Sequence, residues 1–456
     1  MKAGFARRCI TPPQGTRLQG FLPRDLQAPV AKVHDDVHVR ILYLEDEGER
    51  LVIVGLDVCF VGRLEAAVIK AALGTEFDLA PRQILLNSSH THASGALGRW
   101  GFAPEERTDE VYLHAVSQRI AQACSEAKRT ACEATLRAGC ATTGVPCSRR
   151  CPDATGAIRN APNPAAPVFN ALPVAVFEDV ASTPICVLFS IGSHPSTVNG
   201  TEVSADYPGV AMSLLDRHHG RPVALFLQGP GGDARPRPCA QAGQWRRNHW
   251  PDVAATGRIV AQETLGHLKH RTRRFRSSLA SAITTVHLPL AVSVTSARRL
   301  RAQANESYWR GRPPWEARWR AGWAEAALRE HDRFGAFGSD TASIVLQRMR
   351  LADGVEIVAL EGEPVGRLGQ IVSDASDAEV AFVLGYSNGE GLYLPTSEML
   401  AEGGYEVESY WEYGYAGPLK PGLEDLIVAG LPRIGDARPR SSTGAIGPST
   451  PRRHRG

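Results

Sequence analysis

The stretch Leu85-Leu86-Asn87-Ser88-Ser89-His90-Thr91-His92 decides how this chain is interpreted. The apolar residues 84–86 predict the end of a buried strand, and the polar run behind them carries histidines two positions apart. On an extended strand, residues i and i+2 point to the same side, so His90 and His92 can serve one site. This pattern predicts a metal or proton-transfer site, although a pair of surface or core histidines would give the same spacing.

A third histidine strengthens this hypothesis. His194 follows a second apolar run, Ile185 to Ile191, and stands just before Pro195. Two buried-strand patterns that each deliver a histidine at the C-terminal end predict one site built from distant segments.

Charge and hydropathy exclude several classes of partner. The chain has 456 residues, 43% of them hydrophobic and 22% charged, which is ordinary for a soluble globular enzyme. Its net charge is +3, and the five arginines after Asp436 account for all of the excess, since +3 minus 5 is −2. The composition therefore indicates no nucleic-acid surface. Because no segment reaches the roughly 18–20 apolar residues of a membrane span, we expect none.

Cysteine usage and the N-terminal residues predict a cytoplasmic location. The nine cysteines are scattered, without the CxxC spacing of a zinc knuckle, which favours reduced thiols. Residues 1–8 lack the apolar stretch of a signal peptide.

Alternating strand and helix patterns predict an α/β protein with layered mixed sheets and flanking helices. We expect one domain over residues 1–434, and a disordered basic tail over 435–456 because that segment lacks apolar periodicity. The expected strands are 37–43, 51–56, 84–87, 173–177, 185–191, 223–227, 357–360 and 380–384. The expected helices are 63–73, 109–136, 209–218, 253–268 and 296–334, the last broken at Pro313-Pro314.

Two further segments suggest binding surfaces. Residues 145–167 are rich in Pro, Arg and Asn, which predicts a long loop of the kind that often binds a ligand. Trp315, Trp319 and Trp323 share one helical face. This face favours packing in the core or at a subunit interface, so a homo-oligomer is one interpretation; an aromatic wall of a substrate pocket is the alternative.

Together these segments resemble the neutral/alkaline (non-lysosomal) ceramidase family, and in particular its catalytic domain. The resemblance extends to about Leu431, and it is carried by motifs in the family's order. These motifs are Ala6–Pro13 ("ITPP"), Ser89–Gly95 ("THTHSGP"), Ser193–Ser196 ("VHPTS"), Ser204–Gly209 ("SGDNKGY"), Gly232–Arg237 ("GDVSPN"), Leu360–Pro364 ("LPGEF") and Asn388–Glu398 ("NxYxxYxTTxEE", with Glu390 for the first tyrosine).

The resemblance implies a set of site residues. It makes His90, His194, Glu363 and Tyr393 the ligands of a zinc ion, with the two imidazoles and the carboxylate leaving room for water. It places His92 beside the metal, to stabilise an oxyanion or to protonate the leaving nitrogen. From the matching segments and their neighbours we further expect Asp233 and Arg235 to serve catalysis, and Gly232, Arg149, Arg150 and Arg235 to bind substrate. The glycines of residues 229–232 are further candidates to donate backbone N–H groups to an oxyanion.

This chain departs from the ceramidase pattern in two ways. Arg235 stands where the family has a serine, so either water attacks alone or Arg235 binds an anionic substrate group. A surface arginine in the loop Pro236-Arg237-Pro238 is the competing interpretation. We also expect this chain to lack the signal peptide and C-terminal β-sandwich domain of secreted ceramidases, which favours a soluble polar or carboxylated substrate over a lipid.

We therefore expect a zinc-dependent hydrolase that cleaves the C–N amide bond of a soluble small-molecule N-acyl substrate by metal-activated water. One alternative is acyl transfer that forms an amide or ester at the same zinc site in a specialised biosynthetic pathway. The other is a non-catalytic relative that binds a ligand in the old pocket. Zinc content separates the enzymes from the binding protein, since a pocket without chemistry has no need of four metal ligands.

Overall fold

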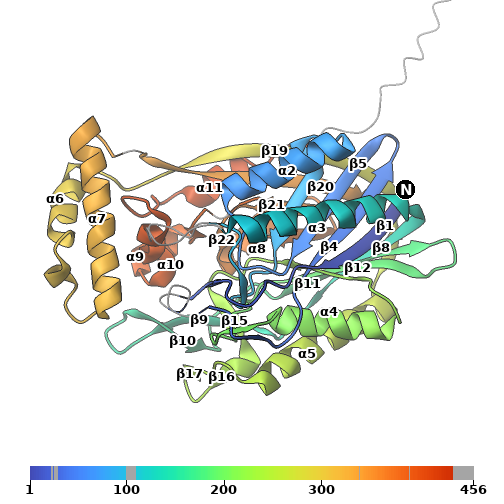
Figure 1. Ribbon diagram of the computed structural model, residues 1–456, viewed down its shortest axis with the longest axis horizontal. Helices are drawn as coiled ribbons and strands as arrows, with labels where there is room; N and C mark the ends of the chain where they lie inside the picture. Colours follow the sequence, from blue (N-terminus) through green and yellow to red (C-terminus); the bar gives the residue numbers. More distant parts are fainter. Residues whose placement is uncertain (22–23, 25–28, 99–108, 338, 390, 435–456) are drawn as a thin grey trace, which may run out of the picture.

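Two β-sheets stacked on each other form the centre of the molecule (Figure 1). The computed structural model describes residues 1–21, 24, 29–98, 109–337, 339–389 and 391–434. The predicted disordered tail and Glu390 lie outside the described residues.

The larger sheet mixes parallel and antiparallel pairs, as predicted. β1 pairs antiparallel with β4, whereas β5 with β6 and β12 with β14 are parallel. Its strands in spatial order are β14 (Ala224–Gln228), β12 (Pro184–Ile191), β11 (Ala171–Asp179), β8 (Cys132–Thr142), β1 (Lys2–Cys9), β4 (His38–Asp46), β5 (Glu49–Leu56) and β6 (Ile84–Ser88), and β18 (Arg273–Phe275) also pairs with β8. The smaller sheet orders β19 (Ser277–Pro289), β20 (Thr341–Ala352), β21 (Val355–Leu360) and β23 (Val380–Leu384).

Side-chain alternation along the strands explains the layers. On β4, Val39, Ile41 and Tyr43 pack under helices, while Leu42 and Leu44 pack against the smaller sheet. Both faces of this strand are therefore buried, which explains its nearly continuous apolar sequence.

Helices close the outer faces of both sheets (Figure 1). On the larger sheet lie α2 (Arg63–Phe77), α3 (Glu110–Arg129), α4 (Asp206–His218) and α5 (Trp250–His270); on the smaller sheet lie α8 (Gly366–Asp374) and α11 (Leu423–Ala429). A separate pair, α6 (Val294–Gln303) and α7 (Pro314–Phe334), is inserted between β19 and β20 and stands at one end of the molecule in Figure 1.

Short strands and helices connect these main elements. The short strands are β2 (Leu18–Gln19), β3 (Lys32–Val33), β7 (Ser94–Gly95), β9 (Pro146–Pro152), β10 (Ile158–Asn163), β13 (Glu202–Val203), β15 (Ala234–Pro236), β16 (Ala240–Gln241), β17 (Gln244–Trp245), β22 (Glu363–Pro364) and β24 (Tyr393–Leu394). The short helices are η1 (Pro81–Gln83), η2 (Arg237–Cys239), η3 (Glu306–Trp309), α9 (Ser397–Glu402), α10 (Tyr405–Glu408) and η4 (Ser409–Tyr413).

The predicted mixed α/β architecture is confirmed, and two predicted segments are wrong. The helix expected over 109–136 ends at Arg129, and β8 begins at Cys132, because residues from there alternate between the two faces of the sheet. The loop expected over 145–167 is largely the hairpin of β9 and β10. The prolines of this segment wrongly favoured a loop, because Pro146 and Pro152 occupy the first and last positions of β9, where a missing N–H costs little.

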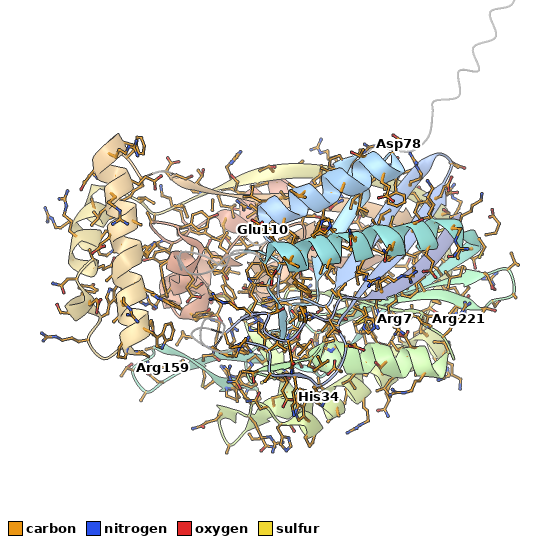
Figure 2. The ribbon with its side chains drawn as sticks, viewed as in Figure 1. Arg7, His34, Asp78, Glu110, Arg159 and Arg221 are labelled. Carbon is orange, nitrogen blue, oxygen red and sulfur yellow. The ribbon has the colours of Figure 1, made fainter. Side chains whose placement is uncertain are left out.

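Buried ion pairs join the larger sheet to α4. Arg40, on β4, lies 3.4 Å from the carboxylate of Asp57 and 3.6 Å from that of Asp216. Arg7, labelled in Figure 2, reaches Asp216 as well, at 2.9 Å. Burial raises the pKa of Asp57 to about 6, although Arg40 opposes the shift. The positive charge of the arginines thus offsets part of the free-energy cost of burying this carboxylate.

Among the described residues, no helix is long and apolar enough to cross a membrane.

Lys70 allows a test of how burial shapes stability. This α2 side chain is buried, with its Nζ 3.5 Å from the carbonyl oxygen of Pro81, and burial lowers its pKa to about 7. Because an unfolded lysine titrates near about 10.4, the unfolded state binds more protons between these values, so stability rises with pH across that range. We expect Lys70→Met to raise the melting temperature by a few degrees at pH ~6, a gain that shrinks toward pH ~10.

Differential scanning fluorimetry across this pH range checks the expectation. Lys269→Met, at an exposed position of α5, serves as the matched control. The expectation would be contradicted if Lys70→Met lowered the melting temperature at acid pH, or if it raised the melting temperature equally at every pH.

Candidate metal centre

The histidines sit where strands of the larger sheet end, as their sequence positions predicted. His90 follows β6 and His194 follows β12. Backbone hydrogen bonds hold both turns: the N–H of His90 donates to Val58 at 2.9 Å, and that of His194 donates to Ala234 at 2.9 Å. His90 has a φ of 64°, a left-handed conformation uncommon outside glycine, which marks it as a position held by its surroundings.

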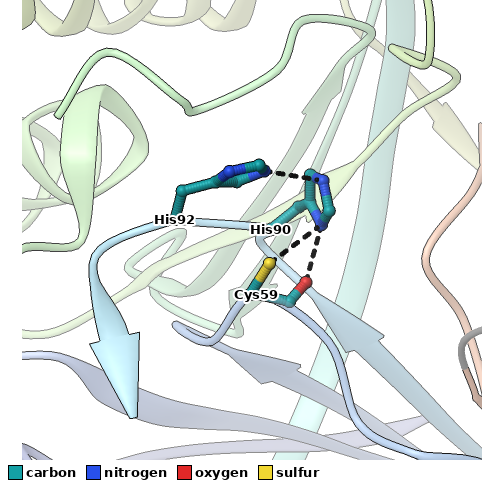
Figure 3. A group of neighbouring side chains, drawn as sticks. All are labelled: Cys59, His90 and His92. Atoms are coloured by element: carbon teal, nitrogen blue, oxygen red, sulfur yellow. Dashed lines mark hydrogen bonds between the residues drawn. The ribbon is translucent and has the colours of Figure 1, made fainter. Parts of the chain in front are cut away.

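Backbone carbonyls orient both imidazole rings. Nδ1 of His90 donates to the carbonyl oxygen of Cys59 at 2.7 Å, as Figure 3 shows, and Nδ1 of His194 donates to that of Gly231 at 2.7 Å. A neutral imidazole that is protonated on Nδ1 carries only a lone pair on Nε2. Both rings are thus fixed in the tautomer that binds a metal through Nε2.

The lone pairs converge with a carboxylate. Nε2 of His90 and Nε2 of His194 are 3.1 Å apart, and Oε2 of Glu363 lies 3.4 Å and 3.2 Å from them. That oxygen is buried and accepts no hydrogen bond from any described residue. Ligands bound at ~2.0–2.1 Å to a tetrahedral zinc lie about 3.3 Å apart, so this acceptor-only group fits such an ion.

The smaller sheet's side of the molecule supplies the other two predicted ligands. Glu363 on β22 pairs directly with Tyr393 on β24 in a parallel ladder. Gly362 permits this close approach: it has a φ of 91°, and a Cβ there would lie 2.5 Å from the carbonyl oxygen of Leu392. The hydroxyl of Tyr393 is 3.4 Å from Nε2 of His194, and the hydroxyl of Tyr413 donates to Oε1 of Glu363 at 2.9 Å.

Electrostatics favour the metal-binding forms of these groups. Burial lowers the pKa of His194 to about 4, with help from the charge of Arg149. Burial alone would raise the pKa of Glu363, but His90 and His194 outweigh it and hold that pKa well below its usual value. At neutral pH His194 is therefore uncharged and Glu363 is ionised, as metal ligation requires.

His92 lies at the edge of this group. Its Nε2 is 3.0 Å from Nε2 of His90, as Figure 3 shows, but the ligand atoms that cluster within 4.8 Å of one another are those of His90, His194 and Glu363. Cys59 forms a second such cluster with His90 and His92. Its sulfur faces Nδ1 of His90 at 3.8 Å, the nitrogen that carries the proton, so this cluster offers a metal fewer free lone pairs.

A cavity of about 550 Å³, called the metal cavity below, opens onto the candidate ligand group of His90 and Glu363. Its volume is within the usual range for small-molecule sites. Its walls include His90, His92, Glu363, Tyr393 and Arg235.

The sequence matches no family model and no protein of curated function. Solved structures do match: the neutral ceramidase from Pseudomonas aeruginosa and a ceramidase complexed with C2, each at a TM-score of 0.69 and 16% identity. Each match covers 94% of this chain and 73% of the other chain. This chain has the neutral ceramidase fold. The predicted resemblance of the architecture is thereby confirmed.

Within the ceramidase fold, the two adjacent arginines of β9 differ in position. Arg149 lines the metal cavity, its guanidinium 5.4 Å from the rings of both Tyr393 and Tyr405, and its Nε donates to Glu406 at 2.8 Å. Arg150 lies against a separate cavity and donates to Glu406 and to Glu402, each at 2.7 Å. The structure therefore brings Arg149, but not Arg150, to the metal cavity.

Two residues of the "GDVSPN"-like segment have structural contacts. The carboxylate of Asp233 accepts the N–H of Gly366 at 2.7 Å, at the start of α8, and Asp233 lies away from the walls of the metal cavity. A Cβ on Gly232 would lie 2.8 Å from the carbonyl oxygen of Glu363, so glycine lets that ligand's strand approach. The N–H groups of Gly229 and Gly232 already donate to Ile191 and Pro364, which leaves neither for an oxyanion.

Arg235, where ceramidases have a serine, lies in the cavity wall and is 1% exposed. The interpretation as a surface arginine is therefore wrong.

The tryptophans divide between the two interpretations that their spacing allowed. Trp323 is buried against Leu300 and Trp411, whereas Trp315 lines the cavity. The inserted helices α6 and α7 thus contribute both to a small separate hydrophobic core and to one wall of the cavity.

Sequence reasoning missed three residues of the site: Tyr413, Glu406 and Arg247. Each belongs to a segment without a recognisable motif, and each acts through contacts with residues far away in the chain. No local signal could have identified them.

The ligand set predicts how metal binding responds to mutation. We expect the protein to hold about one zinc ion per chain, and His194→Ala to abolish tight binding, because it removes one of the two oriented lone pairs. Zinc content after exhaustive dialysis, measured by inductively coupled plasma mass spectrometry, checks this. His114→Ala, at an exposed position of α3, is the control. Full zinc occupancy in His194→Ala would refute the assignment.

Proposed function

We propose that this protein is a zinc-dependent amidohydrolase that cleaves soluble small-molecule N-acyl compounds. The observation that carries the proposal is the buried group of Nε2 of His90, Nε2 of His194 and Oε2 of Glu363, which has acceptor atoms and no proton between them. Tyr393 is the fourth, weaker ligand, since burial raises the pKa of its hydroxyl well above the usual value although Arg149 opposes the shift. The ceramidase fold supports hydrolysis of an amide rather than of another bond.

A zinc ion held by these residues would supply Lewis acidity, which would polarise a carbonyl oxygen and lower the pKa of water toward about 7. The hydroxyl of Tyr413 holds the far oxygen of Glu363 and keeps the near one directed at the ligand group. The cavity receives the substrate, and Tyr405 and Trp315 give its walls aromatic surface.

His92 is the residue that we propose moves the proton. Its imidazole lines the cavity, with Nε2 3.0 Å from a ligand nitrogen, so it can reach both the attacking water and the leaving nitrogen. Hydrolysis adds water across the amide: a C–O bond forms at the carbonyl carbon, the C–N bond breaks, and one proton passes to the nitrogen. His92 accepts that proton and then delivers it.

The proposal is tested by measuring free amine released from a panel of N-acyl amides. We expect release by the zinc-loaded protein, loss of release after chelation, and recovery when zinc is restored. His194→Ala should show no release with or without zinc. Undiminished activity in the chelated protein would contradict a zinc enzyme, and product formed only when a second amine or alcohol is added would favour acyl transfer instead.

His92 has a separate signature. We expect His92→Ala to lower kcat by ~10²–10⁴-fold, the usual contribution of a general acid–base residue, while zinc content stays unchanged. Parallel measurement of zinc and kcat distinguishes the two roles of a histidine. Loss of zinc in the purified variant would make His92 a ligand, and an unchanged kcat would remove it from the reaction.

A further inference from the structure

One wall of the metal cavity carries a buried cation with unused hydrogen-bond donors. Arg235 on β15 is 1% exposed, and its Nη2 donates to the carbonyl oxygen of Ser196 at 2.6 Å. Its Nε and Nη1 are buried and have no acceptor among the described residues. Leaving charged donors unpaired in the interior costs free energy, so this arrangement is built for an acceptor that comes from outside the chain.

Arg247 adds a second cation to the same wall. Its guanidinium lies 4.8 Å from the ring of Phe21, and no described carboxylate forms an ion pair with it. Burial lowers the pKa of Arg235 to about 9, and the charge of Arg247 is the next largest cause. These two like charges in one cavity therefore oppose each other until an anion joins them.

The other arginines of this cavity form ion pairs within the protein. Arg149 is paired with Glu406 at 2.8 Å, and Arg320 with Glu316 at 2.8 Å. Among the described residues that line the cavity, Arg235 and Arg247 are the arginines without a carboxylate partner, and the same cavity is lined by His90 and Glu363.

A nearby arginine shows what a purely structural role looks like. Arg237, two residues beyond Arg235, lies at the surface and donates to the carbonyl oxygens of Gly144 and Pro146 at 3.2 and 3.5 Å. Arg235 instead turns inward, where the ring of Trp245 lies 5.0 Å from its guanidinium carbon. An aromatic face and unpaired N–H donors are features of an arginine that recognises a ligand.

We propose that Arg235 and Arg247 bind a carboxylate of the substrate, which makes N-acyl amino acids the substrate class. The inference rests on the proposed function, since it takes the scissile amide to lie at the metal ligands in the same cavity. A carboxylate matches the planar guanidinium and is close to the amide in an N-acyl amino acid. A phosphate would offer similar oxygens, so the test includes both anions.

Binding is measured by isothermal titration calorimetry, on zinc-loaded and on chelated full-length protein. The probes are N-acetylglycine, its neutral analogue N-acetylglycinamide, and inorganic phosphate. We expect the chelated protein to bind N-acetylglycine about tenfold or more tightly than the neutral amide, because each charge-assisted hydrogen bond contributes this much. Equal binding of the two, or tighter binding of phosphate, would overturn the carboxylate assignment.

Variants locate the binding site. Arg247→Gln and Arg235→Gln should each remove most of the preference for the carboxylate, and Arg235→Lys, which keeps the buried charge, should retain part of it. Arg246→Gln is the matched control, because the neighbouring Arg246 is paired with Asp252. If Arg235→Gln fails to fold, the other two variants still decide. The proposal would be overturned if Arg247→Gln and Arg235→Lys both kept the full preference for N-acetylglycine over N-acetylglycinamide.

The two proposals fail in different ways. Selective binding of N-acetylglycine by a protein that hydrolyses no amide would support the carboxylate site and contradict the hydrolase. Hydrolysis of neutral and carboxylated amides with equal kcat/KM would support the hydrolase and overturn the carboxylate site.

Discussion

The site depends on two hydrogen bonds from imidazole to backbone. The carbonyl oxygens of Cys59 and Gly231 hold the Nδ1 protons of His90 and His194, and this alone decides that both Nε2 lone pairs face Glu363. If either ring turned over, a proton would lie where a ligand atom is needed. The scaffold must therefore keep two loops, one after β5 and one after β14, in register with two others that carry the histidines.

Stacked sheets meet this requirement because their strand ends come together at one end of the molecule. Asn87, at the end of β6, shows how the ends are tied: its Oδ1 accepts from Gln228 at 2.8 Å, and its Nδ2 donates to Gly385 at 2.9 Å. One buried amide thereby joins β6 to β14 and to the segment after β23. Asn87 therefore fixes the ends of strands from both sheets relative to each other, and it lies three residues before His90.

Much of this arrangement is predictable where the signal is local. Buried strands such as β6 and β12 and the histidines behind them are visible as apolar runs that end in polar residues. The long antiparallel strands β19 and β20 were not predicted, because β19 is partly exposed and lacks an apolar run. Long-range pairing also escaped prediction: Arg150 matches a motif, yet it pairs with Glu402 and Glu406 and lies against a separate cavity. Motifs identify residue types, whereas the partners that orient them come from elsewhere in the chain.

The order of the proposed ligands along the chain determines when each of them is available during synthesis. From His194, the second histidine, to Glu363, 363 minus 194, are 169 residues. At ~5–20 residues per second, the ribosome needs about 8–34 s to cover them. During that interval a nascent chain carries both histidines without the glutamate, and an imidazole pair favours copper over zinc. Under the proposed zinc ligation, the ion that the chain acquires therefore depends on which ions the cell keeps scarce during synthesis, as well as on the geometry of the folded site.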